Sequence, residues 1–223
     1  RGYGYSGQAN TDYGYSYTDW HGAYKGVMQN KFRKADGTFD YGAVEELNAN
    51  NENGSIMVMT KAKNYHNWYG LVSTYNTKLT KDIDFYGGVD FRFYKGTHTN
   101  DIVDLYGGKY FIDSTRKSVK PENNANAANQ SWVYQKLGVG DAVYRDYDGH
   151  VVQEGAFFQA EYSKNGLSSF LSGSLSNTSY WRYDRLYYDK KNAESETKNY
   201  LGFTVKGGAN YNLNDNHNVF FNV

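Results

Sequence analysis

Aromatic side chains gather with charged ones in two stretches of the sequence, "SWVYQKLG" and "SYWRYDRLYYD". Aromatic rings offer apolar stacking faces, while Arg and Asp add charged hydrogen bonds, so such stretches suit the capture of a sugar or a peptide. The alternative is that these rings pack against one another and form the small hydrophobic cores that long loops need. The residues expected to bind a substrate are Trp132, Tyr134, Trp181, Arg182, Tyr183 and Asp184.

The stretch "YRDYDGH" places Asp146 and Asp148 beside Gly149 and His150. It is similar to the opening of a calcium loop but lacks the remaining ligand spacing and the terminal Glu, so we expect a solvated turn. The five His residues are scattered, and the chain has no Cys. No pair stands at the spacing of metal ligands. We therefore expect no metal and no cofactor.

No constellation of residues points to an enzyme. The paired carboxylates of glycoside hydrolysis come from distant strands, so spacing nominates none of the acidic residues. The glycines of "GVGDAVY" and "YGGVD" lack the strand-to-helix context of a phosphate cradle. We expect the protein to act by binding, without covalent chemistry.

Composition excludes several classes of protein. The 223 residues carry a formal net charge of zero, which gives no reason to expect a nucleic-acid partner. No run approaches the 18 or so apolar residues of a membrane-spanning helix, although transmembrane β-barrels contain no such run. The chain opens on "RGYGYSG", without an initiator Met or a signal peptide, and closes within a strand-like run. We expect it to be a segment of a longer protein.

From residue 67 the sequence alternates with the period of two that is typical of strands. Residues 1–66 are expected to be mostly loop with short strands and one helical turn at 43–47. The six expected strands are 68–79, 82–96, 155–163, 167–176, 200–213 and 218–223.

One set of alternate residues in these strands carries no ionisable side chain and mixes Phe, Leu and Val with Gly, Ala and Ser. Tyr69, Tyr162 and Tyr211 stand near strand ends in this set, as in the headgroup belt of a membrane protein. The charged residues that share the opposite phase are Lys78, Asp84, Asp90, Arg92, Glu161 and Lys206. A lipid face must lack such charges, and so must the core face of a soluble sandwich.

The lengths of the connections between strands favour a transmembrane barrel over a soluble sandwich. Tight turns follow the first, third and fifth strands, whereas long polar segments, about 96–154 and 177–199, follow the second and fourth. Loops beyond about 12–15 residues are uncommon in compact domains, and outer-membrane barrels alternate short periplasmic turns with long extracellular loops. We predict an all-β, antiparallel up-and-down transmembrane β-barrel segment in which residues 1–223 form part of one barrel domain. Phe85, Val89, Phe91 and Phe93 would face lipid.

With these features, residues 68–223 resemble part of the barrel of a TonB-dependent outer-membrane receptor, SusC-like or related. The resemblance rests on the "YGGVDFRFYKG" strand before a long loop, the "VKGGANYNLNDNHNVFFNV" hairpin, and loops rich in Tyr, Asn and Gly. It implies a 22-strand barrel with an N-terminal plug, in the outer membrane of a Gram-negative bacterium. Neither a plug nor the usual C-terminal aromatic is visible, so both ends of such a receptor are expected to lie outside the chain.

The resemblance implies nutrient uptake, with a glycan, a peptide or a metal chelate as the cargo. The implied partners are TonB, through the absent N-terminal region, a SusD-like surface lipoprotein in the SusC-like branch, and outer-membrane lipid. Two alternatives stay open. One is a smaller outer-membrane porin or adhesin barrel, and the other is a soluble β-sandwich carbohydrate-binding module.

Overall fold

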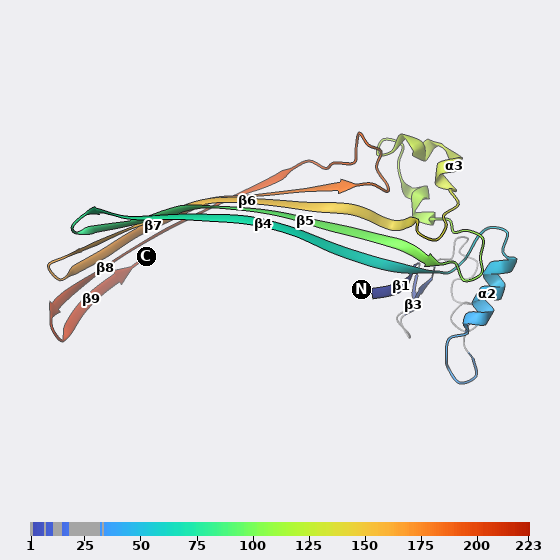
Figure 1. Ribbon diagram of the computed structural model, residues 1–223, viewed down its shortest axis with the longest axis horizontal. Helices are drawn as coiled ribbons and strands as arrows, with labels where there is room; N and C mark the ends of the chain where they lie inside the picture. Colours follow the sequence, from blue (N-terminus) through green and yellow to red (C-terminus); the bar gives the residue numbers. More distant parts are fainter. Residues whose placement is uncertain (1, 7, 11–14, 18–31, 33) are drawn as a thin grey trace. The chain divides into compact units, whose positions relative to one another are not determined.

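A computed structural model gives the fold and describes residues 2–6, 8–10, 15–17, 32 and 34–223. In these ranges seven strands form one sheet in the order β1-β4-β5-β6-β7-β8-β9 (Figure 1). From β4 to β9 the neighbours in the sheet are also neighbours in the chain. The predicted antiparallel, up-and-down, all-β fold is therefore confirmed.

The main strands are β4 (Val58–Thr80), β5 (Ile83–Asp104), β6 (Ala142–Lys164), β7 (Leu167–Asp184), β8 (Lys198–Asn214) and β9 (His217–Asn222). The short strand β1 (Gly2–Ser6) pairs with the start of β4, and β2 (Gln8–Asn10) pairs with β3 (Tyr15–Tyr17). The helical segments are α2 (Tyr41–Asn50), η1 (Ser114–Ser118), η2 (Ala125–Ala128) and α3 (Gln130–Val133). No helix among the described residues is long and apolar enough to span a membrane.

The strands β4 to β8 run for 17 to 23 residues, longer than the sequence pattern predicts. The predicted tight turns are confirmed at residues 81–82, 165–166 and 215–216. The predicted long connections are wrong in extent: they span 105–141 and 185–197. The added strand residues mix many polar side chains with a few apolar ones, so hydropathy does not mark where these strands end. Cross-strand contacts such as the ion pair of Lys63 with Asp101 stabilise them, together with the burial of Val58, Ile102 and Val143.

The region expected to be mostly loop contains a ten-residue helix, α2, in place of a single turn. The side chain of Asp40 caps it by accepting a hydrogen bond from the Ala43 N–H at 3.2 Å. The buried Asn48 amide then fixes the helix to its surroundings. It donates to the carbonyls of Met57 and Leu105 at 2.9 Å each and accepts from the Ile56 N–H.

The chain divides into two compact units. The first unit comprises residues 1–65, 96–149 and 182–195, and the second comprises 66–95, 150–181 and 196–223. Every buried hydrophobic residue among the described ones belongs to the first unit, in clusters around Val44 and Met57 and around Ile102 and Phe111. The second unit is a single layer of strands in Figure 1.

Each strand of the second unit has an apolar face, the side that carries Val205, and a polar face, the side that carries Lys206. Directly opposed residues of an antiparallel pair share a face, and β7 and β8 pair Gly173 with Val205 but Ser172 with Lys206. The ion pair of Lys78 with Asp84 at 3.3 Å places these two residues on one face of β4 and β5. The predicted grouping of alternate residues is thus confirmed for these strands.

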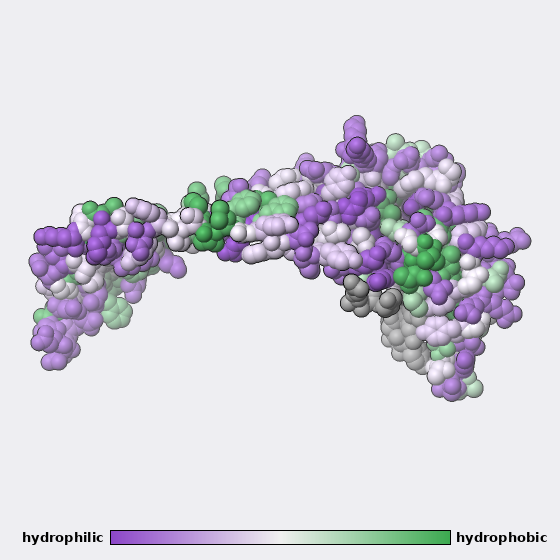
Figure 2. Space-filling model, in the orientation of Figure 1, coloured by the Kyte–Doolittle hydropathy of each residue, from purple (hydrophilic) through white to green (hydrophobic). Residues whose placement is uncertain are grey.

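The apolar face is exposed. Leu71 is 65%, Val89 54% and Phe203 80% accessible, and Figure 2 shows hydrophobic side chains at the surface of the strands. Phe85 and Phe93 are half-buried, Phe93 because its ring lies between those of Tyr69 and His150. No described residue of the second unit forms a hydrophobic core over this face.

Two groups of aromatic side chains occur on the apolar face. The aromatic row crosses β4 to β7 through Tyr69, Phe93, His150 and Trp181, with ring centroids 6.4, 6.2 and 4.9 Å apart in turn. Tyr162 and Tyr211, in the same alternation, lie close to the tight turns at 165–166 and 215–216. Aromatic residues therefore stand toward both ends of this face.

Candidate binding sites

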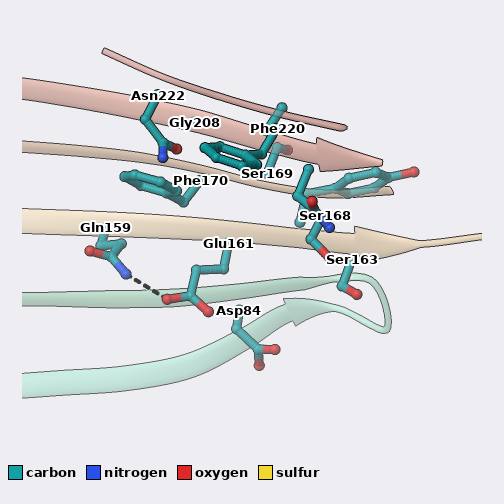
Figure 3. Close-up of a pocket in the computed structure, with 13 residues that line it drawn as sticks. Asp84, Gln159, Glu161, Ser163, Ser168, Ser169, Phe170, Gly208, Phe220 and Asn222 are labelled. Atoms are coloured by element: carbon teal, nitrogen blue, oxygen red, sulfur yellow. Dashed lines mark hydrogen bonds between the residues drawn. The ribbon is translucent and has the colours of Figure 1, made fainter. Parts of the chain in front are cut away.

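The polar face of the second unit contains a hollow of about 620 Å³ between β5 and β9. Figure 3 shows the carboxylates of Asp84 and Glu161 on one side of it and the rings of Phe170 and Phe220 on the other. The Gln159 amide donates to Glu161 Oε1 at 2.5 Å. Gly208 allows the Phe170 ring to lie close to the sheet, because a Cβ there would approach it to 2.6 Å.

The first unit carries a second candidate, the polar row of Asn64, His98, Tyr147 and Arg182. One residue comes from each of β4, β5, β6 and β7. His98 Nδ1 lies 2.7 Å from the Asn64 amide oxygen, and its ring stacks on that of Tyr147 at 5.0 Å. The Arg182 guanidinium lies 3.9 Å above the centre of the Tyr147 ring. Lateral contacts thus hold four side chains of different strands in one row.

The carboxylate of Asp184, only 2% exposed, holds Arg182 in place. Asp184 Oδ2 accepts a hydrogen bond from Arg182 Nη2 at 2.5 Å, while Oδ1 accepts the backbone N–H groups of Leu186 and Tyr187 at 2.9 Å each. Both carboxylate oxygens are therefore occupied within the protein. Asp184 positions Arg182 and closes the turn after β7, rather than facing a ligand.

Arg185 fastens the same turn to β6. Its Nη1 and Nη2 donate to the two carboxylate oxygens of Asp148 at 2.7 and 3.1 Å, and its Nε donates to Asp146 at 2.8 Å. Hydrogen bonding to Asp148, opposed by burial and supported by Asp146, raises the pKa of Arg185. Thr97 of β5 donates to Asp148 as well, at 2.7 Å.

Asp113 joins the two long connections. It accepts the Tyr187 hydroxyl at 2.9 Å and the Thr115 backbone N–H at 3.0 Å. Burial, and then the Asp113 carboxylate, raises the pKa of Tyr187. Residues 105–141 and 185–197 are therefore joined to each other by side-chain hydrogen bonds.

The expectation of a solvated turn at "YRDYDGH" is wrong, because the stretch lies within β6. Its two carboxylates bind Arg185, and the His150 ring stacks on Trp181 at 4.9 Å and 5°. Among the described residues no group of three or more His, Cys, Asp or Glu could hold a metal ion.

The predicted substrate-binding residues lie in three settings. Trp132, in α3, and Tyr134, just after it, each have a cation over the ring: Arg116 at 5.0 Å and Lys117 at 5.3 Å. Trp181 belongs to the aromatic row, whereas Arg182 belongs to the polar row with Asp184 beneath it. Tyr183 forms an antiparallel bridge with Glu194 across the turn.

Sequence reasoning missed Asn64, His98 and Tyr147. They stand on strands whose ends the hydropathy pattern does not mark, and none is part of an aromatic cluster in the sequence. No apolar alternation in the sequence marks these positions, so only the pairing of the strands reveals them.

The first unit offers guanidinium, imidazole, amide and phenol groups side by side, and the second offers carboxylates beside aromatic rings. Both arrangements suit reversible binding through hydrogen bonds and charge. A scan against protein-family models finds no match to the chain, and a search of the curated proteins finds none either.

Proposed function

We propose that this chain is a wall segment of an outer-membrane β-barrel that imports a nutrient in a TonB-dependent manner. The observation that carries the membrane part is the uncovered apolar face of the second unit, which no described residue buries. Contiguous apolar patches beyond a few hundred Å² are rare on soluble monomers and mark contact surfaces. Lipid is the contact that suits a single-layer sheet with a polar reverse side.

The dimensions of the apolar face agree with this proposal. Twelve residue steps separate Tyr162 from His150 along β6, which is about 40 Å at about 3.3 Å per step. A strand tilted by about 40° then advances about 30 Å along the membrane normal, close to an apolar band of about 25 Å with its aromatic girdles.

Glu154 is an exception to the charge-free face, and so is Lys95, which follows Phe93 by two residues on β5 at the margin of the second unit. Because β6 begins at Ala142 rather than near residue 155, Glu154 lies within the strand, two residues from Ala156, and is exposed. The expectation that this face carries no ionisable side chain is wrong at this position. Glu154 stands eight steps from Tyr162, about 20 Å along the normal by the same arithmetic. It would lie toward the outer margin of the band, where acidic residues cost little.

The transport part of the proposal rests on the family resemblance of "YGGVDFRFYKG" and the closing hairpin, and on the large loop assembly. A porin or adhesin barrel would use the same wall without TonB. A soluble sandwich would need a second layer over the apolar face, and strands of the usual five or six residues would serve it better than strands of 17 to 23.

The absence of Cys makes single-cysteine labelling a clean test. We expect Phe203→Cys in isolated outer membranes to react with a lipid-soluble maleimide and to resist a charged one. Its neighbour Thr204→Cys, on the polar face, should react with the charged reagent. Equal reaction of both cysteines with the charged reagent would refute the membrane assignment. Growth on the transported nutrient that is unchanged by deletion of TonB would instead favour the porin or adhesin.

A further inference from the structure

We infer that the polar row binds the carboxylate groups of an acidic oligosaccharide. The inference rests on the proposed function, because it names the class of ligand that the transporter would recognise. Neither the family resemblance nor the sequence pattern assigns a charge to the cargo. The assignment comes from the side chains that the first unit brings together.

Arg182 is built to meet an anion. Its guanidinium is fixed from two directions, by the Tyr147 ring at 3.9 Å and by Asp184 at 2.5 Å, yet 49% of the side chain is exposed. Its Nε and Nη1 donate to no acceptor among the described residues. A planar guanidinium held in one orientation with free N–H groups matches the two oxygens of a carboxylate.

Arg145 adds a second cation on the side of β6 that carries Tyr147. Arg145 precedes Tyr147 by two residues on β6, so the two side chains share one side of the strand, about 7 Å apart at Cα. Its side chain makes no hydrogen bond or ion pair with any described residue. A cation that no described residue pairs, next to a row of interlocked side chains, suits an anionic ligand.

The charges near the row are unbalanced in favour of an anion. Asp184 is the carboxylate beside Arg182, and both of its oxygens are occupied. Asp146 and Asp148 are bound to Arg185. Arg145 and the open edge of Arg182 are therefore not neutralised by these neighbours, and a ligand carboxylate would meet two guanidinium groups.

The neutral members of the row favour a sugar over a peptide. Tyr147 contacts His98 and Arg182 through its ring. Its hydroxyl group has no hydrogen-bond partner among the described residues and can therefore bind a ligand. Asn64 is exposed and adds an amide N–H group. Hydroxyl and amide groups beside guanidinium groups complement the hydroxyl-rich, carboxylate-bearing ring of a uronic acid.

The test compares ligands that differ only in charge. Oligogalacturonate and alginate oligomers, their methyl esters, and oligoglutamate are titrated into the detergent-solubilised protein, with binding followed by calorimetry. We expect at least one uronate to bind and its ester to bind at least tenfold more weakly. Arg145→Gln should weaken uronate binding about tenfold, since 1.4 kcal/mol corresponds to a factor of ten.

Two further variants separate recognition from folding. Arg182→Lys keeps the positive charge beside Asp184 but removes the planar guanidinium that can donate two parallel hydrogen bonds to a carboxylate. It should weaken binding as well. Arg92→Gln, whose arginine pairs with Asp90 at 3.5 Å in the second unit, should leave binding unchanged. Arg145 makes no hydrogen bond or ion pair with a described residue, so its variant stays informative even if Arg182→Lys folds poorly.

Each other outcome overturns the inference: no binding of either uronate, equal binding of acid and ester, no effect of Arg145→Gln, or oligoglutamate binding as tightly as the uronates. The cysteine labelling described above decides the membrane assignment separately. A protein that labels as a membrane barrel but binds no uronate would refute the inference alone.

Discussion

Val205 offers a quantitative test of what the apolar face contacts. It is 69% exposed, is paired with Gly173 across β7 and β8, and lies six residues from Tyr211. Six steps of about 3.3 Å advance about 20 Å along the strand, or about 15 Å along the normal at a tilt of about 40°. Val205 would then lie near the middle of an apolar band of about 25 Å.

The substitution Val205→Arg gives opposite results in lipid and in water. At the midplane of a bilayer an outward-facing Arg costs about 2–4 kcal/mol, which is roughly a 30- to 900-fold loss in the folding equilibrium. At an exposed position in water the same change stays within about 0.5 kcal/mol. The aliphatic contacts that Val205 loses are few in either case, because the residue is mostly exposed.

The assay is equilibrium unfolding in urea from phosphatidylcholine vesicles, followed by tryptophan fluorescence and by gel mobility with and without heating. The matched control is Thr204→Arg, on the polar face, which loses only the hydroxyl contact with Ser174 at 2.7 Å. We expect Thr204→Arg to cost about 1 kcal/mol. A cost for Val205→Arg no greater than that of Thr204→Arg would refute the placement of this face in lipid.

Three other predictions concern the fold and the loops. Gly88→Ala should destabilise the sheet by about 1–3 kcal/mol in the same urea titration. The new Cβ would meet the Ser73 carbonyl and, at 2.6 Å, the Phe157 ring. Gly149→Ala should not destabilise the sheet, because the space around Gly149 is open. Arg185→Gln leaves the carboxylate of Asp148, which is 6% exposed, without its guanidinium partner. It should lower the free energy of opening of residues 185–197 by about 3–5 kcal/mol, which faster proteolysis of this segment would show. Lys198→Gln should leave the rate of proteolysis unchanged. Because burial and Asp113 raise the pKa of Tyr187, the stability that its protonated form gives is complete below the unfolded pKa of about 10 and is lost as the pH rises above it. The protection factors of the loop amides, which are exchange rates corrected for base catalysis, should therefore fall above that pH in the wild type and in Tyr188→Phe but not in Tyr187→Phe.

The phase of the faces was predictable from sequence because hydropathy encodes it directly, and the order of the strands was predictable from the tight turns between them. In β8, Phe203 and Val205 alternate with Thr204 and Lys206, and the observed register with β7 preserves that alternation. The turn at 165–166 was predictable from its Asn-Gly pair, with Asn165 and Gly166 both at positive φ.

The ends of the strands were not predictable, since the pairing there depends on partners distant in sequence. Asp146 and Asp148 look like turn residues until Arg185, from another connection, neutralises them. The same limit applies to the polar row. Arg182 and Asp184 are neighbours in sequence and were found together, while His98 and Tyr147 meet only when β5 and β6 are in register.

The two units differ in where their stabilisation comes from. The first has hydrophobic clusters around Val44 and Ile102, which provide the burial that drives folding in water. The second has an ordered sheet but no buried hydrophobic residue among those described, and a single layer of strands gains too little from hydrogen bonds alone to be stable in water. Its stability must come from whatever covers Leu71, Phe203 and their neighbours. A protein layer would exclude a charge at Val205 through packing, and it would have to come from outside the described residues. Lipid would exclude the charge through its low polarity, with a cost that declines from Val205 toward Tyr211, so the depth dependence of the Arg substitution separates the two.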